Sequence, residues 1–259
     1  MNNKIPISIL ILAKNEEAQI ARTLSPLLDM SDDVILLDNG STDQTMAIAQ
    51  SFGVRVEQIE WTGYSDTKNK GHQRAKYDWI LSLDADEEIK EELKSDILNV
   101  FSTTQKNEQA WMLKRKLVYG GKTLHHGAVS NEYRIRIFNK KNARWNENDV
   151  HEDIEFSQEI KLNKLQGYLL HHSYKNQEEH LKKLRKYATL FFHQQQKKNT
   201  QIPFYKKYIS PYFGFVKNYF FRFGFLDGKK GFQYALAEMK YTYWKYRSEK
   251  KVNDSNTSQ

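Results

Sequence analysis

The chain has 259 residues and a formal net charge of +8 at pH 7, and its length allows one large domain or a domain with an appendage. It contains no cysteine, which excludes disulfides, thiolate metal sites and cysteine nucleophiles. No stretch approaches the roughly 20 apolar residues that cross a bilayer, and the apolar run at residues 5–13 passes into charged residues, unlike a signal peptide, so we expect a cytoplasmic protein.

The first hundred residues alternate apolar runs with segments of helical character. Short, nearly all-apolar runs are typical of strands buried on both faces of a parallel sheet, and here they occupy residues 7–13, 34–37 and 79–83. A further strand is expected at residues 54–59, which are more polar. Helices are expected at residues 15–28, 45–52, 68–75 and 87–101. This alternation predicts an α/β fold with a doubly wound, mostly parallel sheet and flanking helices.

The pattern becomes less regular after residue 105. Strands are expected at residues 110–118, 133–138 and 165–170, and a helix at 178–196. The segment 204–247 is aromatic and basic, and residues 248–259 form a polar tail that we expect to be disordered.

A pair of carboxylates, Asp84 and Asp86, directly follows the fourth expected strand, residues 79–83. Residues two apart on an extended chain face the same side, and the carboxyl ends of parallel strands are where α/β proteins bind ligands. Carboxylates suit Mg²⁺ and Mn²⁺, which usually keep positions open for phosphate oxygens. The pair therefore predicts a metal and diphosphate site, although Asp-x-Asp at a strand end also occurs without any metal.

Asp38 ends the second apolar run and begins a polar loop. A carboxylate here is suited to accept hydrogen bonds from a base N–H or a ribose hydroxyl. The alternative is that residues 38–43 supply only turn and helix-cap chemistry. The chain has no G-x-G-x-x-G and no G-x-x-x-x-G-K-[ST] pattern, so a dinucleotide fold and a P-loop are unsupported.

Taken in order and spacing, these segments resemble the family 2 glycosyltransferases of GT-A fold. Over about the first 100 residues, the resemblance is carried by residues 8–17, 38–43, 68–69 and 78–87. It continues at residues 136–138, 145, 150–152, 170–174 and 224–231. This full-length set is similar to the WaaE type of lipopolysaccharide-core glucosyltransferase.

The resemblance implies roles for the matching positions. Asp38 would bind the base, usually uracil, Asp84 would contact the ribose side, and Asp86 would bind the metal. The full predicted donor-binding set is Ala13, Asn15, Glu16, Asp38, Lys68, Asp84 and Arg136. The chain has Leu12-Ala13-Lys14 where many relatives have Pro-x-Tyr, which puts base stacking from this loop in doubt.

Four basic side chains beyond the first hundred residues are candidates for the site. His171 and His172 point to opposite faces of an extended strand, so at most one reaches the site. Relatives carry a histidine matching His171, which could bind the metal or the diphosphate, or could be an ordinary hydrogen-bonded histidine. Arg134 and Arg136 alternate on an expected strand and could meet phosphates of the donor or the acceptor, or could be solvated.

The catalytic base is expected in the segment 150–153. Inversion at an anomeric carbon needs a carboxylate that takes the proton from the acceptor hydroxyl. By resemblance Glu152 is that base, and Asp153 is the alternative. Both could also be ordinary acids on a solvated loop.

The aromatic and basic segment indicates a partner. Seventeen of the 34 aromatic residues lie between Phe204 and Tyr246, and residues 101–259 carry 30 Lys/Arg against 14 Asp/Glu, whereas residues 1–100 carry 10 against 18. Such a segment could lie on an anionic membrane, where each basic residue contributes ~1 kcal/mol, pack onto the rest of the chain, or bind single-stranded nucleic acid. We favour the membrane, and we expect some of the aromatic residues to pack onto the chain in either case. No RRM, KH or zinc-finger pattern supports nucleic acid.

The combined prediction is an inverting hexosyltransferase dependent on Mg²⁺ or Mn²⁺. It would move glucose from UDP-glucose to a lipid-linked glycan such as the lipopolysaccharide inner core, peripherally on the inner face of the plasma membrane. The alternatives are a transferase for capsule, exopolysaccharide or protein glycan, a nucleotidyltransferase, or a non-catalytic binding module. The expected domains are a GT-A catalytic domain at 1–175 (nucleotide half 1–105, acceptor half 106–175), a helical region at 176–247 and the tail.

Overall fold

The computed structural model describes residues 4–103, 107–130, 132–146, 153–197 and 203–247, with side chains omitted for residues 194–197. The chain forms two compact units. Unit 1 comprises residues 1–116 and 131–172, and unit 2 comprises residues 117–130 and 173–259. Every described residue of the candidate site belongs to unit 1.

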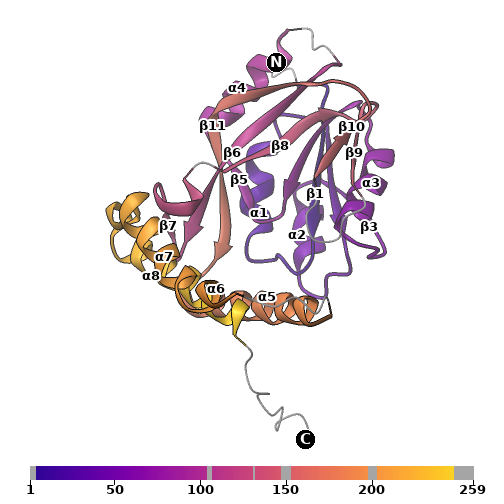
Figure 1. Cartoon of the computed structure of the whole chain (residues 1–259). Helices are drawn as coiled ribbons and strands as arrows, with labels where there is room; N and C mark the ends of the chain where they lie inside the picture. The colour runs from indigo at the N-terminus through magenta and orange to yellow at the C-terminus, as the bar shows by residue number, and fades with distance from the viewer. Residues whose placement is uncertain (1–3, 104–106, 131, 147–152, 198–202, 248–259) are drawn as a thin grey trace, which may run out of the picture. The chain divides into compact units, whose positions relative to one another are not determined.

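The elements of the chain are shown in Figure 1. The strands are β1 (Ser8–Ala13), β2 (Asp33–Asp38), β3 (Arg55–Gln58), β4 (Trp79–Asp84), β5 (Glu87–Ile89), β6 (Gln109–Tyr119), β7 (Lys122–Thr123), β8 (Glu132–Asn139), β9 (Ala143–Trp145), β10 (Ile154–Phe156) and β11 (Lys161–Tyr174). The α-helices are α1 (Ile20–Leu24), α2 (Thr45–Ser51), α3 (Tyr64–Arg74), α4 (Glu91–Phe101), α5 (Gln177–Lys197), α6 (Phe204–Tyr208), α7 (Ser210–Val216) and α8 (Gly228–Tyr246). Shorter helical turns are η1 (Ser25–Leu27), η2 (Gly127–Val129), η3 (Lys217–Phe221) and η4 (Gly224–Asp227).

The main sheet of the described chain has the strand order β3-β2-β1-β4-β8-β6-β11-β5, with β7 paired to β6. Strands β3, β2, β1 and β4 are parallel, so that Leu10 lies between Ile35 and Ser82. Strand β8 joins β4 in the antiparallel sense, with Phe138 opposite Ile80. The carboxyl ends of the four parallel strands therefore lie along one edge, where the predicted polar residues follow them.

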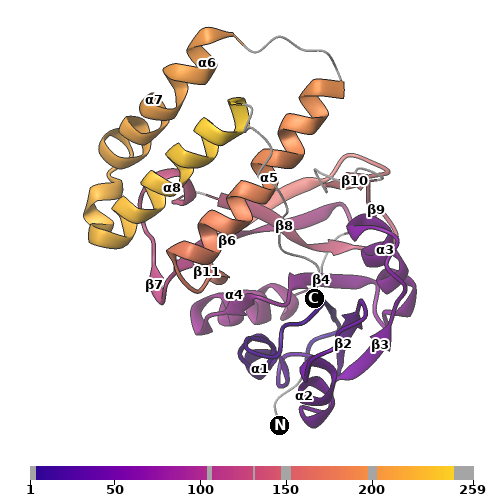
Figure 2. The ribbon, with the colours of Figure 1, turned by 90° about the horizontal axis from the view of Figure 1, so that it is seen from below.

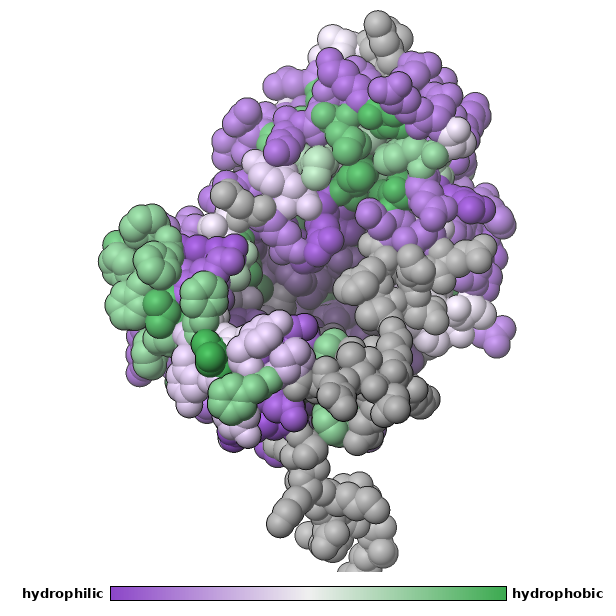
Figure 3. Space-filling view, in the orientation of Figure 1, coloured by the Kyte–Doolittle hydropathy of each residue, from purple (hydrophilic) through white to green (hydrophobic). Residues whose placement is uncertain are grey.

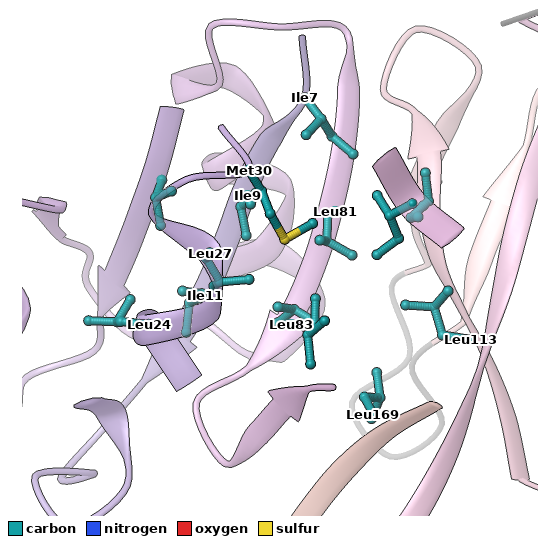
Figure 4. Packing of buried hydrophobic residues seen from close by; sticks show 14 of the residues in the cluster. Ile7, Ile9, Ile11, Leu24, Leu27, Met30, Leu81, Leu83, Leu113 and Leu169 are labelled. Carbon is teal, nitrogen blue, oxygen red and sulfur yellow. The ribbon is translucent and has the colours of Figure 1, made fainter. Parts of the chain in front are cut away.

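Apolar side chains on both faces of β1 explain why this strand is central. Ile9 and Ile11 belong to a core that α1, α2 and α4 cover, whereas Leu10 belongs to a second core on the other face with the β9–β10 hairpin. Figure 4 shows the first core, where Leu24 of α1 and Leu27 lie beside the apolar side chains of β1 and β4. A continuous apolar run is the pattern that such a doubly covered strand requires.

The predicted fold class is confirmed: helices cover an α/β sheet, and helices follow at the C-terminus. Two helices differ from the prediction. Residues 87–89, expected to begin a helix, form β5 because β11 pairs with them, Ile89 opposite Leu169, and helix α4 begins only at Glu91. The expected helix at 15–28 is reduced to α1, because the left-handed φ of 56° at Asn15 and the η1 turn interrupt it.

Unit 2 contains the C-terminal helices. Helix α8 contacts both α5 and α7, and Figure 2 shows these helices alongside one another. Within the unit, the buried imidazole of His180 stacks on Tyr234 with ring centroids 5.2 Å apart. No helix among the described residues has the length and apolar character needed to cross a membrane. The expected domain boundaries, including the one at residue 175, stay a prediction.

Candidate functional site

A cavity of about 640 Å³ lies in unit 1 at the carboxyl edge of the parallel strands. The ends of β1, β2 and β4 line it, together with parts of α3, β6, β8 and β11. Of the residues predicted from the sequence, the cavity brings together Ala13, Glu16, Lys68, Asp84, Asp86, Arg136, Asp153 and His171. Residues up to 158 positions apart in the sequence therefore meet at one place.

Asp84 is anchored by a buried network of charges. Nη2 of Arg136 donates hydrogen bonds to Asp84 Oδ2 (2.7 Å) and to Glu87 Oε1 (2.5 Å). The other carboxylate oxygen of Glu87 accepts from the backbone N–H of Asp84 (3.1 Å), and Arg115 Nη1 lies 3.4 Å from Glu87. The carboxylate of Asp84, with a third of its side chain exposed, is therefore held in one orientation at the cavity.

The network fixes the charges of its members. Burial by itself raises the pKa of Asp84. The charges of Arg136 and Lys68, the hydrogen bond from Arg136 and the nearby His171 lower it by more in total, so this pKa lies well below its ordinary value. Burial likewise lowers the pKa of Arg136, whereas Asp84 and Glu87 raise it further above its ordinary value. Asp84 is therefore an anion and Arg136 a cation at neutral pH.

Lys68 on helix α3 is a second cation beside Asp84. Its side chain is buried, with Nζ 3.5 Å from Asp84 Oδ1 and 4.3 Å from the ring centroid of Trp145. The neighbouring Asn69 exchanges two hydrogen bonds with the backbone of Trp145, at 2.9 and 3.0 Å. Helix α3 is therefore fastened to β9 at the point where Lys68 enters the site.

Asp86 and His171 form a donor pair at the cavity. Nε2 of His171 lies 3.1 Å from Asp86 Oδ2, and each side chain is 20% exposed. His172 points elsewhere, because its Nε2 lies 2.9 Å from Glu88 and its Nδ1 lies 3.1 Å from Arg22. The expectation that at most one of the two histidines reaches the site agrees with this geometry.

A carboxylate oxygen and an imidazole nitrogen are a donor set that a divalent cation can share with phosphate oxygens and water. Among the described residues, no group of three His, Asp or Glu side chains gathers around a single point as a closed metal site. The pair at Asp86 therefore fits a cation that takes its remaining ligands from a substrate.

Asp38 lies beneath the cavity and does not line it, whereas Asn39 does. The Asp38 side chain is fully buried, and its Oδ2 accepts from the backbone N–H groups of Gly40 and Ser41, both at 3.0 Å. Within the described chain, Oδ1 of Asp38 and Oδ1 of Asn39 are buried and have no hydrogen-bond partner. The turn hydrogen bonds that the sequence offered as an alternative are thus present. Two buried oxygen atoms remain without a donor among the described residues.

The loops after β1 and β2 are joined to each other. The N–H of Asn15 donates to Ser41 Oγ (2.9 Å), and Oδ1 of Asn15 accepts from the N–H of Thr42 (2.8 Å). Further along the same two loops, the N–H of Glu17 donates to Asp43 Oδ2 (3.1 Å). Asn15 therefore holds the two loops together and does not line the cavity itself.

The expected base falls on a segment that the structure describes only in part. Glu152 lies outside the described residues. Asp153 is exposed and lines the cavity, and its Oδ1 accepts from the N–H of Ile154 (2.9 Å). Both acids stay candidates for the base.

Several residues at the site were not predicted. Arg115 and Glu132 form an ion pair of 2.6 Å at the cavity, and Arg115 also reaches the buried Glu87. Alternating charges on predicted strands were a signal for these, but the pairing of β6 with β8 was needed to bring them together. Trp61 and Tyr64 also line the cavity, and the aromatic pair flanking Gly63 was a signal available from the sequence.

A protein family and several known proteins are similar to this chain in sequence. The family profile described as Glycosyl transferase family 2 matches residues 8–169. An uncharacterized glycosyltransferase of Rickettsia typhi is 30% identical over 234 residues, 87% of this chain and 80% of that protein. The lipopolysaccharide core biosynthesis glycosyltransferase LpsC of Rhizobium meliloti is 26% identical over 246 residues, 93% of this chain and 90% of that protein.

Among solved structures, S. aureus TarS aligns with a TM-score of 0.47 at 17% identity. The alignment covers 73% of this chain and 40% of the TarS chain. This chain therefore spans less than half the length of that solved relative.

Proposed function

The chain belongs to glycosyl transferase family 2, and on that premise we propose that it transfers a hexose from a nucleotide sugar to a glycan with inversion at the anomeric carbon. The proposed donor is UDP-glucose. The proposed acceptor is a membrane-anchored glycan such as the lipopolysaccharide inner core, which the similarity to LpsC supports. The narrower WaaE type stays a prediction.

The observation that carries this proposal is the meeting of Lys68, Asp84, Asp86 and His171 at one cavity. A cation beside paired carboxylates at the carboxyl edge of a parallel sheet suits a metal-bound diphosphate. The direct test is a screen of UDP-, GDP- and ADP-sugars for nucleotide release, repeated with truncated core oligosaccharides as acceptors. Acceptor-dependent release of UDP from UDP-glucose supports the proposal, and the absence of release from every donor contradicts it.

Each charged residue has a separate task in the proposed reaction. Mg²⁺ or Mn²⁺ held by Asp86 and His171 would neutralise charge on the leaving diphosphate. Lys68 adds a positive charge beside Asp84, with its Nζ 3.5 Å from Asp84 Oδ1. Arg136 is already bonded to Asp84 and Glu87, so its proposed task is to orient Asp84 toward the ribose.

Glu152→Gln is expected to lower kcat by at least about 100-fold, the usual contribution of a general base. The Kd of UDP should stay within about twofold, because the base acts on the acceptor hydroxyl and makes no contact with the nucleotide. Initial rates of UDP release and calorimetry with UDP and Mn²⁺ measure the two quantities on the same protein.

Asp153→Asn is the matched comparison, because Asp153 is the neighbouring acid and lines the cavity. Under the proposal this variant keeps kcat within about tenfold of the wild type. A wild-type kcat for Glu152→Gln together with a large loss for Asp153→Asn would move the base to Asp153.

The proposed membrane attachment is supported by an apolar face on unit 2. Figure 3 shows hydrophobic residues gathered over α7 and α8. Phe221 is 71% exposed and Phe204 69%. The apolar face comprises the exposed side chains of Phe204, Tyr205, Tyr208, Ile209, Tyr212, Phe213, Val216, Phe220, Phe221, Phe223, Phe225, Leu226 and Phe232. Contiguous exposed patches of this kind mark interaction sites.

Basic residues accompany the apolar face along the same segment. They are Lys206, Lys207, Lys217, Arg222, Lys229 and Lys230, against the single acid Asp227 between residues 204 and 230. Asp227 is itself buried, where it accepts hydrogen bonds from the N–H groups of His125 and His126. An apolar surface with only positive exposed charge is complementary to an anionic lipid headgroup layer.

The double variant Phe213→Asp/Phe221→Asp is expected to lower partitioning onto phosphatidylglycerol vesicles by about tenfold or more, because it removes two apolar side chains and adds two negative charges. Vesicle co-sedimentation at low salt measures the effect, and higher salt should weaken wild-type binding as well. Leu190→Asp is the control, since Leu190 is 51% exposed on α5 and lies outside the apolar face. Equal binding by all three proteins would assign the face to another partner.

A further inference from the structure

Trp61 and Tyr64 present aromatic rings at the cavity of unit 1. Their side chains are 43% and 49% exposed, and the rings meet edge to face with centroids 4.6 Å apart. The other aromatic residue in the described lining is Trp145, which is only 5% exposed and lies against Lys68. Trp61 and Tyr64 are therefore the exposed aromatic residues of the described lining.

The position of Tyr64 on helix α3 relates it to the charged part of the site. Tyr64 and Lys68 are four residues apart, so they share one side of the helix and are separated by ~6 Å along its axis. Lys68 in turn lies 3.5 Å from Asp84. An aromatic surface followed by a cation matches the order of groups in a nucleoside diphosphate, which has a flat base at one end and phosphates at the other.

The end of strand β2 lies beside the aromatic pair. The backbone N–H of Ile59 donates to the backbone C=O of Asp38 (2.8 Å), and Trp61 is only two residues further along the chain. The buried Oδ1 atoms of Asp38 and Asn39, unpaired within the described chain, lie at this same strand end. Buried acceptors without partners are rare in folded proteins, and the single ring N–H of a uracil is a suitable donor for one of them.

The turn that carries the two rings is stabilised by its own hydrogen bonds. Gly63, between them, has a φ of 110°, a conformation that favours glycine. The hydroxyl of Thr62 bonds to Asp66 and accepts from Lys70 Nζ (2.8 Å). The rings are therefore held at the cavity wall by a braced turn.

We infer that Trp61 and Tyr64 form the stacking surface for the nucleobase of the donor, an inference that rests on the proposed function. Strand β1 ends in Leu12-Ala13, and the loop that begins at Lys14 contains no aromatic residue up to helix α1. The stacking surface is supplied instead from the end of β3 and the start of α3. The ligand group recognised there is a planar pyrimidine, with its ring on the aromatic pair and its polar edge toward Asp38 and Asn39.

Calorimetry with UDP and with inorganic pyrophosphate, both in the presence of Mn²⁺, tests the inference on the full chain. Trp61→Ala and Tyr64→Ala should each weaken UDP binding by about tenfold, because base–aromatic stacking is lost. Binding of pyrophosphate, which has no base, should stay within about twofold. Trp61→Phe should retain most of the UDP affinity, and Tyr187→Ala, at a comparably exposed tyrosine on α5, should leave it unchanged.

Other outcomes overturn the inference in distinguishable ways. Unchanged UDP affinity with a raised KM for the acceptor would assign the aromatic pair to the acceptor sugar. Equal loss of UDP and pyrophosphate affinity would show that the variants disturb the phosphate site. Wild-type protein that binds pyrophosphate but not UDP would overturn the proposed function together with this inference.

Discussion

Asp86→Ala is expected to lower kcat for sugar transfer by about 1,000-fold or more. A divalent cation at a leaving diphosphate stabilises the transition state by several kcal/mol, and about 1.4 kcal/mol corresponds to a tenfold change in rate. Asp86 supplies the carboxylate of the donor pair with His171, so its removal leaves the cation with a single proposed protein ligand. Rates of UDP release across a Mn²⁺ titration measure the loss.

Asp78→Ala is the matched control, because Asp78 is an exposed acid in the same unit whose partner is the surface Lys141. Circular dichroism and thermal melting of both variants establish that the fold survives. Near wild-type transfer by Asp86→Ala at saturating Mn²⁺ would show that the metal site has been assigned to the wrong carboxylate.

Arg136→Met should lower the free energy of unfolding by about 3–5 kcal/mol, the usual loss when one partner is removed from a buried ion pair. Arg136 is 4% exposed, and its partner Glu87 is fully buried. Without Arg136, the carboxylate of Glu87 would retain the longer contact to Arg115 and the N–H of Asp84. Urea denaturation monitored by circular dichroism measures the change.

Arg134→Met separates this effect from a general loss of positive charge. Arg134 lies two residues earlier on β8, and its 56% exposed side chain pairs with Glu132 at the surface. Exposed pairs contribute about 1 kcal/mol or less, so Arg134→Met should change stability by no more than that. Equal effects of the two substitutions would mean that the buried network does not stabilise unit 1.

The parallel half of the sheet was predictable because its strands are covered on both faces. Residues 79–83, for example, are apolar except for the buried Ser82, and β4 was found at Trp79–Asp84. Residues 87–89 were assigned wrongly to a helix because the pairing partner of β5 lies about 80 residues away on β11. Long-range pairing of this kind leaves no local signal in three residues.

The sequence predicted the charged residues of the candidate site that directly follow a strand. It did not predict the roles of residues that depend on contacts with distant segments. Asp84 and Asp86 follow a strand and reach the cavity as expected. Glu87, next to them, gave no sign of being fully buried, because its burial depends on arginines from β6 and β8. Asn15 was expected to line the nucleotide site, whereas its described contacts hold one loop to another.

The reciprocal bonds between the loops after β1 and β2 have a dynamic consequence. Neither loop can leave its position without breaking bonds that the other holds, since Asn15 both donates to Ser41 and accepts from Thr42. The two loops should therefore open to solvent as one cooperative unit, and their amide protons should exchange with deuterium at a shared rate. The conformational entropy of the two loops is then lost during folding. A ligand that binds at this edge of the sheet therefore does not have to order them.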